Sequence, residues 1–328
     1  MTKTGWRAWL GAALTLAAIA SCTAAVAQNY PSRPITVIIP FAGGSASDVV
    51  SRIMFDKMSR SMGQPIVVEN RPGAGGNNGT AAAAKAAPDG YTLVGSGSGP
   101  FAANKSLYKD LGYDPETDFE VIGPFAFFNI VVVVSAKLPV KNLQELIAHA
   151  KAHPGALNYG SVGIGSSQHL GGEYFQQVAG VKLTHVPYRN IAQYGPDLIA
   201  GQVPLGFQWL PNVNAPLKSG GAKALAVAAK TRLPALPDVP TTAEAGLPDY
   251  IASGWFALAA PKGTPKPIVE RLNKEMAAAL ADPALQEKFQ VQGAEGRVPS
   301  VAESVKFVRD EIRKWDGIIT KAGIPKIE

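Results

Sequence analysis

The stretch that decides the fold is ITVIIPFAGGSASD, residues 35–48. Residues 35–39 are apolar and mostly β-branched, which is typical of a strand buried on both faces. From Asp48 to Met58 apolar residues recur at helical spacing, so a helix follows the glycine pair Gly43-Gly44. At such a junction the first backbone N–H groups of the helix lack internal acceptors, and the helix dipole favours negative charge. The turn therefore predicts a binding site for a small anion such as a carboxylate or a phosphate.

The strand–helix pattern continues downstream of this turn. We expect a strand at 66–70, an alanine-rich helix at 80–87 and a strand at 91–94. Alternation of this kind predicts a parallel sheet covered by helices. The glycine turn at 70–79 comes close to a dinucleotide-binding fingerprint, but Asn78 stands where the third glycine is required. We therefore reject a nucleotide cofactor.

The pattern starts again after residue 124. The apolar segment 125–136 is long enough to pass from one lobe into another, and residues 257–260 would carry the chain back. Between them we expect strands at 157–161, 183–188, 204–209 and 222–228 with helices at 143–152, 169–178 and 191–200; helices at 267–281 and 301–322 close the chain. The fold class is α/β, with two open, mainly parallel sheets joined by two crossing strands. We assign residues 28–126 and about 230–290 to the first lobe, and 127–229 and about 291–328 to the second.

In open α/β sheets ligands bind outside the carboxyl ends of the strands. The turns concerned are 41–47, 96–104, 161–168 and 187–190. In the third, Ser166 or Ser167 suits a helix N-cap, with its hydroxyl also available to a ligand. Two anion sites are thus expected to face each other across a cleft.

The N-terminus has the composition of an export signal. Lys3 and Arg7 form a basic start, residues 9–20 are apolar, and residues 25–27 form a small-residue cleavage site. Cys22, the only cysteine, lies in a segment that resembles a bacterial lipobox, so lipid anchoring is the alternative. We favour cleavage after Ala27, which leaves a mature chain that cannot form an internal disulfide.

The charge of the mature chain argues against nucleic acid as a partner. Without Lys3 and Arg7, 29 basic residues face 25 acidic ones, and no run of lysine and arginine accompanies the excess. A small, dispersed excess of this kind indicates solubility rather than a polyanion-binding face.

Motifs for catalysis are absent from the sequence. The segment 95–99 fails as a serine-hydrolase turn, because Gly97 holds the serine position. His149 and His153 are four residues apart but lack an intervening glutamate and a third ligand, so a solvated helix end explains them better than a metal does. We expect no enzyme activity, no cofactor and no metal.

A series of ordered motifs resembles the Bug family of extracytoplasmic solute-binding proteins, the receptors of tripartite tricarboxylate transporters. The motifs are the turn with Gly43, Gly44 and Asp48, VVENRPGAGG (67–76), PDGYTL (88–93), Gly163-x-Gly165-Ser166, HVPY (185–188), AGQV (200–203), LPDVPT (236–241) and AGLP (245–248). The resemblance implies a type II periplasmic-binding-protein fold that closes on a small carboxylate. It also implies a periplasmic location and a membrane permease as partner, and we expect a monomer. A sensor that presents ligand to a histidine kinase, and a periplasmic enzyme on the same scaffold, remain the alternatives.

The candidate ligand-binding residues combine these turns with the resemblance. They are Phe41, Ala42, Gly43, Gly44, Ser45 and Asp48 in the first turn, Ser98 and Asn104 in the second, Ser161, Gly163, Gly165, Ser166 and Ser167 in the third, and Tyr188, Arg189 and Gln208. We expect Asp48 to orient its turn more than to contact ligand. Phe101, Tyr188 and Trp209 are candidate aromatic walls.

Two of these positions depart from the pattern that the family commonly shows. Arg189-Asn190 stands where a lysine and a glycine are usual, and Gln208 stands where an acid is usual. An arginine can bind a carboxylate through two parallel hydrogen bonds, which a lysine cannot do. Loss of an acid at the cleft would argue against a ligand with a free amino group.

Overall fold

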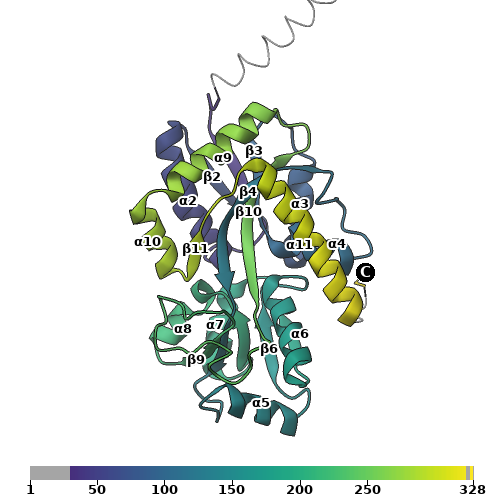
Figure 1. The fold of residues 1–328 in the computed structure, drawn as a ribbon, viewed down its shortest axis with the longest axis vertical. Helices are drawn as coiled ribbons and strands as arrows, with labels where there is room; N and C mark the ends of the chain where they lie inside the picture. The colour runs from purple at the N-terminus through teal and green to yellow at the C-terminus, as the bar shows by residue number, and fades with distance from the viewer. Residues whose placement is uncertain (1–29, 323–325, 328) are drawn as a thin grey trace, which may run out of the picture.

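The computed structural model describes residues 30–322, 326 and 327, and shows two lobes stacked along the long axis of the molecule (Figure 1). The expected signal peptide, residues 1–27, and Cys22 lie outside the described residues. Each lobe is a sheet with helices on its faces. No helix within the described residues is long and apolar enough to cross a membrane.

The first lobe is built on a six-stranded sheet. Its strand order is β11 (Ala294–Gly296), β4 (Phe119–Asn129), β10 (Ser253–Pro261), β3 (Thr92–Gly97), β1 (Ile35–Ile39) and β2 (Ile66–Asn70). Its helices are α2 (Ala46–Met62), α3 (Asn77–Ala84), α4 (Asn104–Leu107), α9 (Lys266–Leu280), α10 (Pro283–Val291) and α11 (Val301–Ala322), with a 3-10 turn η1 (Ala74–Gly76) and a π-helical turn η2 (Gly99–Ala103).

The second lobe is built on a five-stranded sheet. Its strand order is β7 (Thr184–Pro187), β6 (Asn158–Ser161), β8 (Leu205–Gln208), β5 (Val131–Ser135) and β9 (Ala222–Val227). Its helices are α5 (Leu143–Ala152), α6 (Ser167–Ala179), α7 (Tyr194–Ala200) and α8 (Asn214–Lys218), with 3-10 turns η3 (Ile191–Gln193) and η4 (Leu210–Asn212).

Local sequence explains why α2 forms directly after the first glycine turn. The Ser45 hydroxyl caps the helix by accepting a hydrogen bond from the Asp48 N–H, and Gly63 ends it in a left-handed conformation. Val50, Met54 and Met58 recur on the face that is buried in the core of the lobe. This packing holds the turn between β1 and α2 at the carboxyl edge of the sheet.

Two segments connect the lobes, and both lie along the centre of the molecule (Figure 1). The outgoing segment passes from β4 to β5 through Ile130, and the returning one enters β10 after Ala252. They meet where the Ile130 N–H donates to the Ala252 carbonyl at 2.9 Å. The two expected crossings are therefore present, although a break at Ile130 divides the predicted strand 125–136 into the end of β4 and β5.

Both sheets are mixed and not mainly parallel as expected. β1 pairs in parallel with β2 and β3, whereas β10 is antiparallel to both β3 and β4. In the other lobe β6 is parallel to β7 and β8, but β5 is antiparallel to β8 and β9. The antiparallel pairs arise at the strands that follow the two crossings. β10 enters the first sheet antiparallel to its neighbours β3 and β4, and β5 enters the second sheet antiparallel to β8 and β9.

The expected lobe boundaries need two corrections. The described part of residues 291–328 packs with the first lobe and not the second: β11 pairs with β4, and α11 covers the six-stranded sheet, where Glu311 accepts a 2.9 Å hydrogen bond from the Trp255 indole N–H. Residues 230–252 pack with the second lobe and not the first, since Leu233 contacts the core beside β5 and the Tyr250 ring lies against Phe175. The chain returns only at residue 253.

Candidate functional site

A cavity of about 470 Å³ lies between the lobes, at the carboxyl ends of β1, β2, β6 and β7. Its lining comes from both lobes: Pro40, Phe41, Ala42, Ser45, Pro72, Gly73, Ala74, Gly75, Asn78 and Tyr108 from the first, and Val162, Gly163, Ile164, Pro187, Tyr188, Arg189 and Ile191 from the second. A neighbouring hollow of about 380 Å³ shares Ala42, Pro72 and Arg189 with the cavity. This volume fits a small molecule.

Asp48 holds the first-lobe turn in shape. Its buried carboxylate accepts hydrogen bonds from the Gly44 N–H at 2.9 Å, from Arg52 at 2.9 Å and from the Asn70 side chain at 2.9 Å. Burial alone would raise the pKa of Asp48, but the hydrogen bonds from Arg52, Gly44 and Asn70 lower this pKa below its usual value. Asp48 therefore holds the turn from behind and stays ionised.

The expected free donors at the start of α2 are partly occupied by the protein itself. The Gly44 N–H donates to Asp48, and the Ala46 N–H donates to the Asn212 side chain of the second lobe at 2.8 Å. These two N–H groups are thus not available to an anion in this structure. The hypothesis of an anion site at the helix N-terminus is corrected to this extent.

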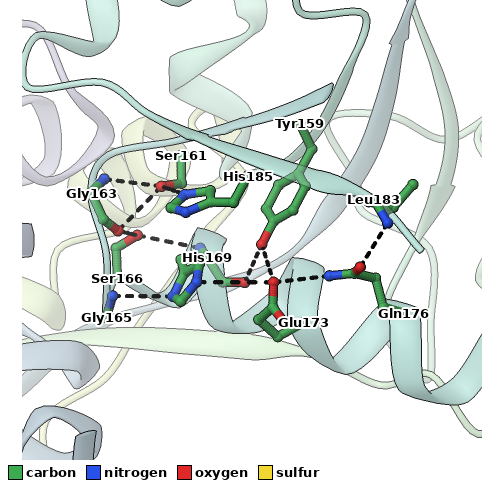
Figure 2. Close-up of polar contacts among 10 residues, drawn as sticks. All are labelled: Tyr159, Ser161, Gly163, Gly165, Ser166, His169, Glu173, Gln176, Leu183 and His185. Carbon is green, nitrogen blue, oxygen red and sulfur yellow. Dashed lines mark hydrogen bonds and ion pairs between the residues drawn. The ribbon is translucent and has the colours of Figure 1, made fainter. Parts of the chain in front are cut away.

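The second-lobe turn is held in a comparable way by side chains that lie behind it. The Ser161 hydroxyl accepts from the Gly163 N–H at 3.0 Å, and the His169 ring accepts from the Gly165 N–H at 3.2 Å (Figure 2). Ser166 caps α6 and donates its hydroxyl hydrogen to the Gly163 carbonyl at 2.7 Å. The glycine turn between β6 and α6 is therefore rigidly supported on its inner side.

Two histidines beneath this turn are buried against each other. The rings of His169 and His185 lie 4.2 Å apart, and His185 Nε2 is 2.6 Å from the Ser161 hydroxyl (Figure 2). Burial, and next the neighbouring His169, lower the pKa of His185 to about 3; burial also lowers the pKa of His169, although Glu173 opposes the shift. Both rings are therefore neutral near pH 7, which leaves His169 Nδ1 free to accept the Gly165 N–H.

The lobes touch around the cavity. The hydroxyls of Ser98 and Ser167 are 2.7 Å apart across the cleft, and the Tyr108 hydroxyl donates to the Ile164 carbonyl at 3.1 Å. Near this bond the glycine turns meet backbone to backbone, since a Cβ on Gly75 would lie 2.0 Å from the Ile164 carbonyl oxygen. The structure is thus a closed arrangement of the lobes.

The expected site residues fall into two groups. Those that line the cavity are Phe41, Ala42, Ser45, Gly163, Tyr188 and Arg189, and Gly43 lines the neighbouring hollow. Those that do not line either space are Gly44, Asp48, Ser98, Asn104, Ser161, Gly165, Ser166, Ser167 and Gln208. The second group supports the turns or joins the lobes instead.

Gln208 and Asn104 show why side chains of the second group are turned away from the cavity. Gln208 is fully buried, donates to the Gly160 carbonyl and accepts from Asn212, which in turn reaches Ala46 in the other lobe. Asn104 is also fully buried and donates to the Asn77 side chain at 2.7 Å. Gln208 does not border the cavity, so the absence of an acid at this position gives no argument against a ligand with an amino group.

The aromatic lining also differs from the expectation. Phe101 packs edge-to-face on Phe119 in the core, and Trp209 stacks on Phe128 at a ring distance of 4.4 Å. Of the three expected rings only Tyr188 lines the cavity, where it is joined by Phe41 and Tyr108. The size and aromaticity of a side chain were therefore not enough to tell the rings of the core, Phe101 and Trp209, from the ring that lines the cavity, Tyr188.

The cavity is also lined by residues that were not individually named as candidates: Pro40, residues 72–75, Asn78, Tyr108, Val162, Ile164, Pro187 and Ile191. Of these, Val162, Ile164 and Pro187 lie in the expected turns 161–168 and 187–190. A signal for residues 72–75 was present, because this glycine turn also follows a strand at the carboxyl edge of the sheet. Rejecting the turn as a dinucleotide site did not exclude it as a site for another ligand. Tyr108 and Ile191 are brought to the cavity by tertiary packing, and their local sequence carries no comparable signal.

The cavity lies between two lobes and is lined by turns from both, which is the arrangement of a ligand-binding receptor. Comparison with known proteins shows the family to which this receptor belongs. The model of the tripartite tricarboxylate transporter family receptor (TctC) matches residues 50–324. Protein BugT of Bordetella pertussis is 37% identical over 324 residues, which is 98% of this chain and 99% of BugT. The chain belongs to this TctC, or Bug, family, which confirms the resemblance drawn from its motifs.

Solved structures confirm the fold class. Rpa4515 of R. palustris, solved with adipate, is 36% identical, with a TM-score of 0.87 over 91% of this chain and 100% of that one. MatC of Rhodopseudomonas palustris, solved with bound malate, is 33% identical, with a TM-score of 0.82 over 88% of this chain and 100% of that one. The bilobed α/β architecture is therefore shared across nearly the whole length of these proteins.

Proposed function

We propose that this protein is a periplasmic solute-binding receptor that captures a small carboxylate between its lobes and delivers it to a membrane permease of the tripartite tricarboxylate transporter type. The observation that carries the proposal is the cavity between the lobes, where the one charged residue that the described chain contributes to the lining is the cation Arg189. Membership of the receptor family supports the role in transport. Adipate and malate, the acids in the two related structures, are both small and each carries two carboxylates.

Binding by lobe closure follows from the contacts around the cavity. Ser98 with Ser167, and Tyr108 with Ile164, join the lobes by hydrogen bonds that exist only while the cleft is closed. A carboxylate held between the turns would add charge-assisted hydrogen bonds to these contacts and exclude water from them. The closed form is then the one that a permease would recognise.

The proposal assigns no catalysis to the protein. Within residues 30–322, 326 and 327, no group of three or more histidine, cysteine and acidic side chains is arranged to hold a metal ion. The histidines nearest the cleft, His169 and His185, support the second-lobe turn from behind and are absent from the cavity lining. One chain encloses the cavity by itself, so we also propose a monomer.

A thermal-shift screen tests the proposal. The exported protein would be melted in the presence of linear dicarboxylates, tricarboxylates, aromatic acids and acidic amino acids, and the added acid would be recovered and analysed. A ligand at 100 times its Kd stabilises the folded state by about 2.7 kcal/mol, which gives a clear rise in Tm. We expect such a rise for one class of acid, with the acid unchanged. No rise with any carboxylate, or conversion of the acid, would contradict the proposal.

A further inference from the structure

Arg189 is the one charged residue in the lining of the cavity and of the hollow beside it, among the residues that the structure describes. It lies two residues after the end of β7 and lines both spaces. The preceding residue, Tyr188, is buried and donates its hydroxyl hydrogen to Asp197 at 2.6 Å. The backbone that carries Arg189 is therefore anchored at the outer end of the cavity.

The guanidinium of Arg189 makes no hydrogen bond and no ion pair with any residue described in the structure. The other two arginines close to the first-lobe turns are already paired. Arg52 contacts Asp48 at 2.9 Å, and Arg71 contacts Glu69 at 2.7 Å. Arg189 is thus a cation that faces the binding space with its hydrogen-bonding capacity unused.

The other residues of the lining indicate which kind of ligand the cavity can hold beside Arg189. Seven apolar side chains make up much of the wall: Pro40, Phe41, Pro72, Val162, Ile164, Pro187 and Ile191. No carboxylate of residues 30–322, 326 or 327 lines the cavity, so a ligand ammonium group would find no counter-ion among them. A ligand with an apolar body and an anionic end fits these walls better than an amino acid does.

We propose that Arg189 determines specificity by binding the outer carboxylate of a linear dicarboxylate. Its planar guanidinium matches a carboxylate with two parallel hydrogen bonds, while the apolar chain of the acid lies against the walls. This inference rests on the proposed function. It adds that the Arg189 side chain binds the second carboxylate of the ligand. A monocarboxylate of equal length lacks this group and is therefore bound more weakly.

The test compares acids of matched length on matched variants. Calorimetry would measure the affinity of the exported wild-type protein for dicarboxylates of four to eight carbons and for the monocarboxylates of the same lengths. Arg189→Gln removes the charge at similar length, and Arg189→Lys keeps the charge without the planar fork. Arg309→Gln is the control, because Arg309 is an exposed arginine on α11 that likewise has no described partner and lies away from both hollows.

We expect the wild type to prefer one dicarboxylate over its monocarboxylate. Arg189→Gln should weaken binding of that dicarboxylate by about 10-fold and change the monocarboxylate by less than about 2-fold. Arg189→Lys should fall between, and Arg309→Gln should match the wild type. An unchanged affinity in Arg189→Gln, or an equal loss for both acids, would overturn the role of Arg189 while the proposed function stands. Failure of the wild type to bind any acid of either series would overturn this inference, whereas the proposed function fails only if no acid of the wider thermal-shift screen binds. Melting without acid shows whether each variant is folded.

Discussion

The contact between Gly75 and Ile164 offers a direct test of lobe closure. Gly75 belongs to the first lobe and has a left-handed backbone, with φ of +61°. A Cβ added there would lie 2.0 Å from the Ile164 carbonyl oxygen and 3.1 Å from its carbonyl carbon, both in the second lobe. Gly75→Ala therefore places a methyl group where the other lobe must come to rest.

The two costs of this substitution act on different states. The left-handed backbone costs an alanine about 1–2 kcal/mol, and this cost is the same whether the cleft is open or closed. The clash exists only in the closed state, and it involves backbone on the opposing side, so no side-chain rotation relieves it. To restore ordinary contact the lobes must stay more than about 1 Å further apart here. If this disfavours closure by about 1.4 kcal/mol or more, affinity falls at least 10-fold.

The assay is calorimetric titration with the acid that the thermal screen identifies, with Gly63→Ala as the matched control. Gly63 ends α2 with φ of +68°, and no atom lies within 4 Å of the position that an added Cβ would take. Both variants should lose about 1–2 kcal/mol of unfolding free energy in urea, but only Gly75→Ala should lose affinity. Equal affinities for the two variants would refute the argument that these turns meet in the ligand-bound form.

Two further predictions concern the side chains that support the turns. Asp48→Asn should lower the unfolding free energy at pH 7 by about 1–3 kcal/mol. Because the bonds to Asp48 lower its pKa in spite of burial, the difference from wild type should shrink as the pH falls below about 4; a difference in urea stability that stays constant to pH 3 would contradict this. For His185, burial and the neighbouring His169 lower the pKa to about 3 in the folded protein. Between about pH 6.5 and this pKa, the His185 side chain therefore binds a proton in the unfolded chain but not in the folded one. Stability should therefore fall from pH 6.5 towards pH 4, and His185→Gln should remove up to about 1.4 kcal/mol per pH unit of that slope; parallel pH profiles would show that His185 does not carry it.

Local patterns in the chain predicted most of the regular elements. The strands expected at 35–39 and 66–70 and the helix at 143–152 agree with β1, β2 and α5 residue for residue. These segments have strong periodicity and clear glycine or capping boundaries, so short-range energetics decides them. Segment 99–124 has no strong local pattern, and it forms η2, α4 and the first half of β4 because it packs against β10 and α11.

The site divides in the same way. The sequence by itself determined that glycine turns follow the strands at residues 40 and 161, that serines cap the helices beyond them, and that Arg189 is an unusual cation near the expected cleft. Only the tertiary structure decided which polar groups are left for a ligand. Gly44 and Ala46 donate to partners 4 and 166 residues away, and Ser98 is joined to Ser167 in the other lobe.

The physical reason is that a hydrogen-bonding group is defined by its partner as much as by its own chemistry. Ser98 and Gln208 have hydroxyl and amide groups that could bind a ligand, but both side chains are buried between packed segments and form their hydrogen bonds within the protein. Arg189 differs because the fold leaves it exposed, in a lining to which no acidic residue of the described part of the chain contributes. Residue type and turn geometry are local properties, whereas the absence of a partner at Arg189 depends on where distant segments come together.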